Sequence, residues 1–371
     1  MPALLALTFL IFIVVLTPAD RILIGPDEGY ELAKGLLISQ GFSLYDEVWT
    51  DQPPLHSHIL ALLFLSSDSV VHKSRIVTMI FACLLVYAFS SFVQNGQTLC
   101  NSLIGCFIIM TSPDFLPLSA SAMLEIPVIA CSMLAVYFQY RHMLHGKLND
   151  LVRALCFLTM AFNVKWTSAL FLPCFLFLLI KAFQCHRNHS RIILRVCGLF
   201  VLLNLTCLSV FHVPIFSTLI PHLQANVSPR FEMLEPTFAA ISSSLALVLF
   251  TILGVWDAVK ERTNQNLSMV ILFATILVFA NLNRPFWFYY SLYFSIPIAF
   301  FGTLGIIRFR TTLRTKFHCF LYSVLLTSTA IPLFLSFQQQ MVFLKAEEPQ
   351  SSELLRFLLL LEVEWVVFGS F

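Results

Sequence analysis

The sequence has few charged residues. Only 11% of its 371 residues are Asp, Glu, Lys or Arg, whereas 58% are hydrophobic. A soluble domain needs far more polar surface, so this composition excludes an ordinary soluble protein. The apolar residues form long runs instead of the short alternating segments of a membrane β-barrel. We therefore predict an all-α polytopic membrane protein.

Motifs that would indicate a cofactor or a metal are also missing. The ten Cys residues show no CxxC spacing, so neither a zinc site nor a disulfide framework is indicated. The chain contains no P-loop, GxGxxG, HExxH or nucleophile elbow. We expect no cofactor, no metal site and no nucleic-acid partner. The missing motifs do not by themselves exclude a bound divalent metal.

About eleven apolar segments have the character of transmembrane helices, the first over Leu4–Leu16 and the last ending near Phe337. Leu55–Leu65 is too short to span a bilayer, so we place it along the membrane surface. We predict a membrane domain over residues 1–337, with a large outer loop over 18–74 that contains surface helices. We assign 338–371 to an outer tail, the start of a truncated soluble region. Five of the spans are placed near Ser74–Val93, Leu99–Thr111, Glu125–Tyr140, Leu155–Phe162 and Ala169–Phe183.

Basic residues concentrate in alternate short loops, which the positive-inside rule assigns to the cytoplasm. These residues are Arg141, Lys147, Arg153, Lys181, Arg187, Arg191, Arg195, Lys260, Arg262, Arg308, Arg310, Arg314 and Lys316. The assignment holds only if Leu55–Leu65 does not cross the membrane. It places a second group on the outer side, at or near helix ends: Asp27, Glu28, Asp51, Glu125, Lys165, His222 and Arg284.

Asp27 and Glu28 lie in the longest polar interval of the first third of the chain, residues 25–54. They could be a solvated helix start, with Asp27 as the N-cap of a helix over Glu28–Ser39. Glu125 favours a functional role, because ionisable groups at membrane depth usually mark a site. Two carboxylates at one surface suit a base that takes a hydroxyl proton and a partner that orients it.

Lys165 and Arg284 are cations at the ends of outer-side spans. Each could be an ordinary interfacial residue beside aromatic side chains. Together they could hold a lipid-linked phosphate or pyrophosphate. Tyr289 and Tyr290 could stack on a sugar or donate to the phosphate. A lone loop histidine is more often solvated than functional; our candidate substrate contacts are nevertheless His222, Tyr289, Asp51 and His56.

Four segments, in this order, carry a resemblance to a known superfamily. They read YDEVWTDQPPLHSHILALLF, SPDFLPLSASAMLEIPVIACSMLAVYF, FNVKWTSALFLPCFLFLL and NRPFWFYYSLYFSIPIAFFG. Together they resemble the lipid-dependent glycosyltransferases of the C type. The nearest group is the bacterial family 39-like one, with the aminoarabinose transferase, the rhizobial galacturonic acid transferases and, more distantly, the protein O-mannosyltransferases. The resemblance covers most of residues 20–305.

The resemblance implies transfer of a sugar, with inversion, from a polyprenyl-phosphate donor to a hydroxyl of a glycolipid, glycan or protein. Asp27 matches the presumed catalytic base, Glu28 its usual neighbour and Glu125 the second acidic position. It also implies a multi-pass protein surrounded by membrane lipid in the bacterial inner membrane, with the active site facing the periplasm.

The donor phosphate site follows from the same resemblance. Lys165 and Arg284 match basic positions near the lipid phosphate, and Tyr290 is placed with them. Some members carry a Lys before the Pro-Pro pair, where this chain has Gln52. The phosphate clamp of this chain therefore departs from theirs.

Two other functions compete with an enzyme. A transporter or flippase for a lipid-linked or amphipathic solute predicts mid-span ionisable residues, broken helices and internal repeats. A non-catalytic scaffold predicts that Asp27 and Glu125 can be replaced together without loss. No clear repeat is visible, and the polar residues cluster on one side, which favours the enzyme.

Overall fold

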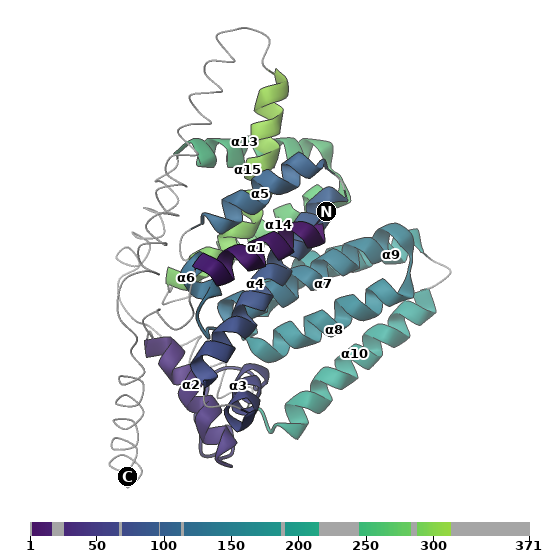
Figure 1. The fold of residues 1–371 in the computed structure, drawn as a ribbon. Helices are drawn as coiled ribbons and strands as arrows, with labels where there is room; N and C mark the ends of the chain where they lie inside the picture. The colour runs from purple at the N-terminus through teal and green to yellow at the C-terminus, as the bar shows by residue number, and fades with distance from the viewer. Residues whose placement is uncertain are drawn as a thin grey trace.

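The computed structural model describes residues 2–16, 26–66, 69–95, 97–112, 115–186, 190–214, 245–282 and 288–312. These residues form helices joined by turns, with an isolated β-bridge between Leu44 and Val48 and no longer strand among them (Figure 1). The predicted all-α class is confirmed.

Several described helices suit a membrane. Five of them are long and apolar enough to cross one, which supports an integral multi-pass protein. The total of eleven spans stays a prediction, since the last one falls outside the described residues. The five segments are Val70–Gln94, Trp166–Cys185, Arg191–Val210, Asn264–Asn281 and Ser291–Phe309.

The centre of the bundle is α7 (Glu125–His145), which is apolar around most of its circumference. Such a helix is stable only when it is surrounded. It packs against α4 (Val70–Gln94), α8 (Leu148–Val164) and α9 (Leu172–Cys185). By contrast α10 (Ser190–Val210) lies beside α8 at the edge, with most of its apolar side chains exposed, as expected for a lipid-facing helix (Figure 1).

Two glycines let α13 (Leu245–Glu261) and α15 (Ser291–Thr312) cross in close contact. A Cβ at Gly254 would lie 1.8 Å from the backbone oxygen of Phe301, and a Cβ at Gly305 equally close to that of Phe250. Apolar side chains gain little by leaving lipid for a protein interior, so membrane helices associate through such tight packing of small residues. The remaining helices of the bundle are α1 (Pro2–Leu16), α5 (Leu99–Met110), α6 (Phe115–Ser119) and α14 (Asn264–Leu282).

Two short helices, α2 (Pro26–Ser39) and α3 (Leu55–Ser66), pack together at one end of the bundle, which we call the α2 end (Figure 1). A small apolar cluster joins them to the start of α4 and to the turn before α7: Leu32, Leu60, Val70 and Ala122. With twelve residues, α3 is about 18 Å long, against a hydrocarbon core of about 30 Å. This agrees with the prediction that the segment does not span.

The opposite end carries many of the basic residues assigned to cytoplasmic loops. There Asp150 is buried, with Arg141 at 3.5 Å and Arg153 at 3.7 Å. Asp150 lies in the first turn of α8, which begins at Leu148, and these cations offset its buried charge. The helix that contains the span predicted near Leu155–Phe162 thus begins earlier, at Leu148.

Candidate active site

The first turn of α2 sends two adjacent carboxylates in different directions. The helix begins at Pro26, so Asp27 lies inside the first turn and the predicted N-cap position is wrong. Successive helical residues diverge by about 100°. Asp27 is consequently exposed at the α2 end, whereas Glu28 is buried against the bundle.

Glu28 holds three parts of the chain together. Arg75 of α4 donates from Nε to Oε1 at 2.9 Å and from Nη2 to Oε2 at 2.8 Å. The backbone N–H of Ala122, just before α7, donates to Oε1 at 2.7 Å. Both partners of the ion pair are almost inaccessible to solvent. Because three hydrogen bonds already engage this carboxylate, the geometry favours a positioning role for Glu28 over the catalytic one we predicted.

Glu125 and Lys165 form a second buried ion pair. Glu125 is the first residue of α7, and Lys165 directly follows the last residue of α8. A short turn joins the end of α7 to the start of α8, and the two helices pack side by side, so the start of α7 and the end of α8 meet at the α2 end. Lys165 Nζ donates to Glu125 Oε1, and both residues are at most 5% exposed. Buried charges are costly unless they are paired in this way. Oε2 of Glu125 is buried without a hydrogen-bond partner in the part of the chain that the structure describes.

Two tyrosines complete the surroundings of Lys165. Its Nζ lies 4.9 Å from the ring centroid of Tyr289 and 5.5 Å from that of Tyr290, within range of cation–π attraction. Both rings precede α15 directly. Burial raises the pKa of both phenols, so each hydroxyl stays protonated and able to donate a hydrogen bond.

Asp27 lies within electrostatic range of this pair. Partial burial raises the pKa of the Asp27 carboxyl, and the negative charge of Glu125 raises it further, against the opposite effect of Lys165. A carboxylate with a raised pKa is a better proton acceptor at neutral pH. Because the side chain is also exposed, an incoming molecule can reach it.

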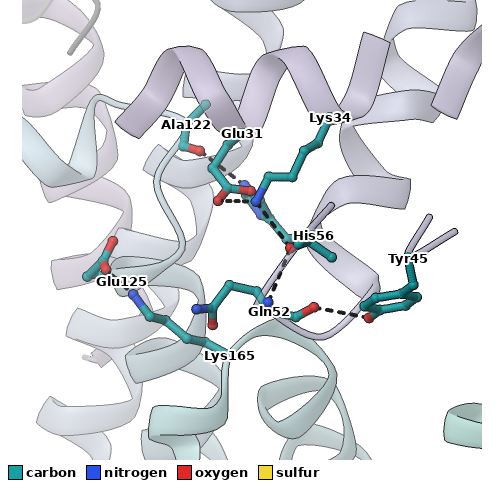
Figure 2. A network of polar contacts seen from close by, with 9 residues as sticks. Glu31, Lys34, Tyr45, Gln52, His56, Ala122, Glu125 and Lys165 are labelled. Carbon is teal, nitrogen blue, oxygen red and sulfur yellow. Dashed lines mark hydrogen bonds and ion pairs between the residues drawn. The ribbon is translucent and has the colours of Figure 1, made fainter. Parts of the chain in front are cut away.

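A further ion pair, which the sequence analysis missed, continues along the same face of α2. Lys34 Nζ donates to Glu31 Oε1 at 2.7 Å (Figure 2). The same Nζ lies 3.4 Å from Thr50 Oγ1. The signal was present in the sequence, because Glu31 and Lys34 follow Asp27 at the i+4 and i+7 positions of a helix.

Hydrogen bonds between side chains and the backbone hold the loop that follows α2. The Tyr45 hydroxyl donates to the carbonyl of Gln52 at 3.0 Å, and the Gln52 N–H donates to Thr50 Oγ1 at 3.1 Å. Gln52 is buried, and Figure 2 shows its side chain beside Lys165. Asp51 is half-buried and close enough to raise the pKa of Tyr290. This loop therefore forms one wall of the site.

His56 faces the protein and not the open side of the site. It is buried, and its Nε2–H donates to the carbonyl of Ala122 at 3.0 Å. Burial lowers the pKa of His56, which keeps the ring neutral. Two predicted residues, Arg284 and His222, lie outside the described residues. The structure thus brings Asp27, Asp51, Glu125, Lys165, Tyr289 and Tyr290 together, with His56 behind them.

Comparison with known proteins gives a family match over part of the chain and a shared fold. The profile of the dolichyl-phosphate-mannose-protein mannosyltransferase family matches residues 51–211. Sequence comparison with curated proteins gives no significant match.

Solved structures share the fold at low sequence identity. ArnT from Cupriavidus metallidurans in the apo state has a TM-score of 0.65 and 14% identity, over 92% of this chain and 76% of ArnT. ArnT bound to undecaprenyl phosphate has the same TM-score and identity, over 91% and 76%. The apo oligosaccharyltransferase from Archaeoglobus fulgidus has a TM-score of 0.50 and 14% identity, over 93% and 57%.

These likenesses concern the fold, since the sequences have diverged widely. With the family match, they confirm the predicted resemblance to the C-type glycosyltransferases and support a membrane glycosyltransferase.

Proposed function

We propose that this chain is an integral-membrane glycosyltransferase that moves a sugar from a polyprenyl-phosphate donor to an acceptor hydroxyl at the α2 end. One observation carries the proposal: an exposed carboxylate, Asp27, lies within electrostatic range of the buried Lys165–Glu125 pair, which the two tyrosines surround. This arrangement occurs on a fold shared with ArnT, one of whose structures holds undecaprenyl phosphate.

Each residue has a chemical task in this proposal. Asp27 takes the proton of the acceptor hydroxyl. At the same time, the oxygen of that hydroxyl bonds to the anomeric carbon of the donor sugar, from the face opposite the phosphate. The bond between the anomeric carbon and the phosphate oxygen breaks, and its electron pair leaves with the polyprenyl phosphate. Lys165, together with Arg284, stabilises the charge that develops on the phosphate. Glu125 holds the Lys165 ammonium in place, and the Tyr290 hydroxyl donates to a phosphate oxygen.

The proposed sidedness rests on charge. Basic residues gather at the end of the bundle away from α2, for example Arg141, Arg153 and Arg308. By the positive-inside rule that end faces the cytoplasm, which puts the site in the periplasm if the protein lies in a bacterial inner membrane. A lipid-linked donor suits this location, and the acceptor would be a glycolipid, a glycan or a protein.

The distribution of ion pairs argues against the transporter alternative. A transporter is expected to carry ionisable groups at mid-span. Within the described ranges, the ion pairs lie at or near helix ends or within the short helix α2.

The test is a transfer assay on purified protein reconstituted in lipid. Wild type and Asp27→Asn receive polyprenyl-phosphate sugars and a panel of acceptors, and free polyprenyl phosphate is measured by mass spectrometry. We expect Asp27→Asn to lose about 10²- to 10⁴-fold in rate, as is typical when a general base is removed. Asp46→Asn is the matched control, because Asp46 is exposed in the same outer loop.

The pH profile gives an independent check on Asp27. The base must be deprotonated, so the rate should fall as the pH drops through a pKa above the ordinary value near 4. Near-normal release by Asp27→Asn would remove Asp27 as the base. A wild type silent with every donor and acceptor would contradict the proposed enzyme.

A further inference from the structure

Glu31 has one carboxylate oxygen that nothing in the described chain satisfies. The residue is 7% exposed; Lys34 engages Oε1, while Oε2 is buried without a hydrogen-bond partner. Buried polar atoms in folded proteins nearly always have a partner, because desolvation without one is costly. This oxygen is therefore set up to accept a hydrogen bond from a molecule that enters the site.

The position of Glu31 limits what that molecule is. It lies one helical turn from Asp27 on the same face of α2, a separation of about 5–6 Å between Cβ atoms. A sugar whose anomeric carbon is close to Asp27 therefore has its other ring substituents within reach of Glu31. Contact with Lys34 holds the Glu31 carboxylate in place (Figure 2).

The charges around Glu31 decide which substituents fit. Lys34, the lysine in contact with Glu31, is already neutralised by this carboxylate. Asp27 adds a further negative charge. A hydroxyl or an ammonium group can donate to Glu31 Oε2, whereas a carboxylate has no proton to donate and is repelled.

We propose that Glu31 is a specificity-determining residue that accepts a hydrogen bond from a hydroxyl or amino group of the transferred sugar. The site consequently takes a neutral or amino sugar and rejects a uronic acid. This inference rests on the proposed function and adds the class of sugar to it.

The experiment compares three donors on one lipid: undecaprenyl phosphate carrying a neutral hexose, an amino sugar or a hexuronic acid. Wild type, Glu31→Gln, Glu31→Asp and the control Asp46→Asn are each assayed for release of undecaprenyl phosphate. The binding of each donor is measured separately, by the shift that it causes in the thermal unfolding midpoint. All four proteins are first compared for folding by circular dichroism.

We expect wild type to prefer the neutral or amino sugar over the uronic acid by at least about 10-fold. A site with a buried group that hydrogen-bonds the substrate strongly rejects an analogue that cannot make that bond. Glu31→Gln should lose about 10- to 100-fold in kcat/KM with the preferred donor and accept the uronic acid relatively better. Glu31→Asp keeps the charge but shortens the side chain, so it should lose rate and still reject the uronic acid. Asp46→Asn should behave as wild type.

Two results would overturn the assignment of Glu31. One is equal use or equal binding of uronic and neutral donors by wild type. The other is a Glu31→Gln variant that loses thermal stability but keeps the wild-type preference among donors, because a merely structural ion pair would behave in this way.

Binding separates this proposal from the proposed function. If wild type transfers none of the sugars yet binds the neutral donor selectively through Glu31, the enzyme is contradicted and the specificity of Glu31 stands.

Discussion

The buried pair between Glu28 and Arg75 offers a sharp test of how the α2 end is built. Replacing Arg75 by Met keeps much of the side-chain volume but removes both hydrogen bonds to Glu28, at 2.9 and 2.8 Å. Glu28 then keeps the N–H of Ala122 as its remaining donor among the contacts described above. With only 2% of Glu28 exposed, water cannot replace the lost partner.

The size of the effect follows from this burial. Removal of one partner from a buried ion pair costs about 3–5 kcal/mol, because an uncompensated charge stays in the protein. Replacing Glu28 by Met at the same time removes that charge, so the double variant should be more stable than either single one. The matched control is Arg308→Met. Arg308 also pairs with a carboxylate, that of Asp257 at 3.3 Å, but the Arg308 side chain is 53% exposed. That change should cost less than about 1 kcal/mol.

The assay is equilibrium unfolding in mixed detergent micelles, followed by circular dichroism. Since α2 could detach before the bundle unfolds, hydrogen exchange of the α2 backbone amides should be measured as well. The reasoning is refuted if Arg75→Met costs no more than Arg308→Met in both measurements. Simple additivity of Glu28→Met and Arg75→Met would refute it too, because the two side chains would then not act as a pair.

Two other predictions concern the site and the membrane core. Lys165→Met should reduce polyprenyl-phosphate release by about 10²- to 10³-fold, as for other groups that stabilise developing charge. Lys165→Arg should retain more activity because the positive charge remains. Equal activity in both variants would contradict a role for the charge. Gly254→Ala should destabilise the protein by about 1–3 kcal/mol or more in the same unfolding assay, because its Cβ would lie 1.8 Å from the oxygen of Phe301. Gly198→Ala, where nothing lies within 4 Å, should be neutral or stabilising, and equal effects of the two alanines would contradict the tight crossing.

Local sequence signals are enough to predict the class of the fold. Long apolar runs in a chain with so little charge must form helices, since only helices satisfy their own backbone in lipid without a closed barrel. Several boundaries follow as well: α5 was expected over Leu99–Thr111 and runs over Leu99–Met110, and α7 begins at Glu125 as expected. The start of α8 was missed because the local pattern around Asp150 looks like a loop.

The candidate site likewise has features that the sequence predicts and features that it does not. The sequence by itself indicated the acidic start of α2, the carboxylate that opens α7 and the lysine after α8. It did not indicate that Glu28 turns inward to Arg75, that Glu125 pairs with Lys165, or that Glu31 keeps a buried oxygen unsatisfied.

The reason is physical. A run of apolar residues determines its own helix, because the hydrogen bonds that stabilise a helix are made within it. An ion pair depends on the distance between groups on separate helices and on the exclusion of water around them. Both quantities arise only when α2, α4, α7 and α8 pack together, so the tertiary structure decides which of the charged residues act on substrate and which hold the site in place.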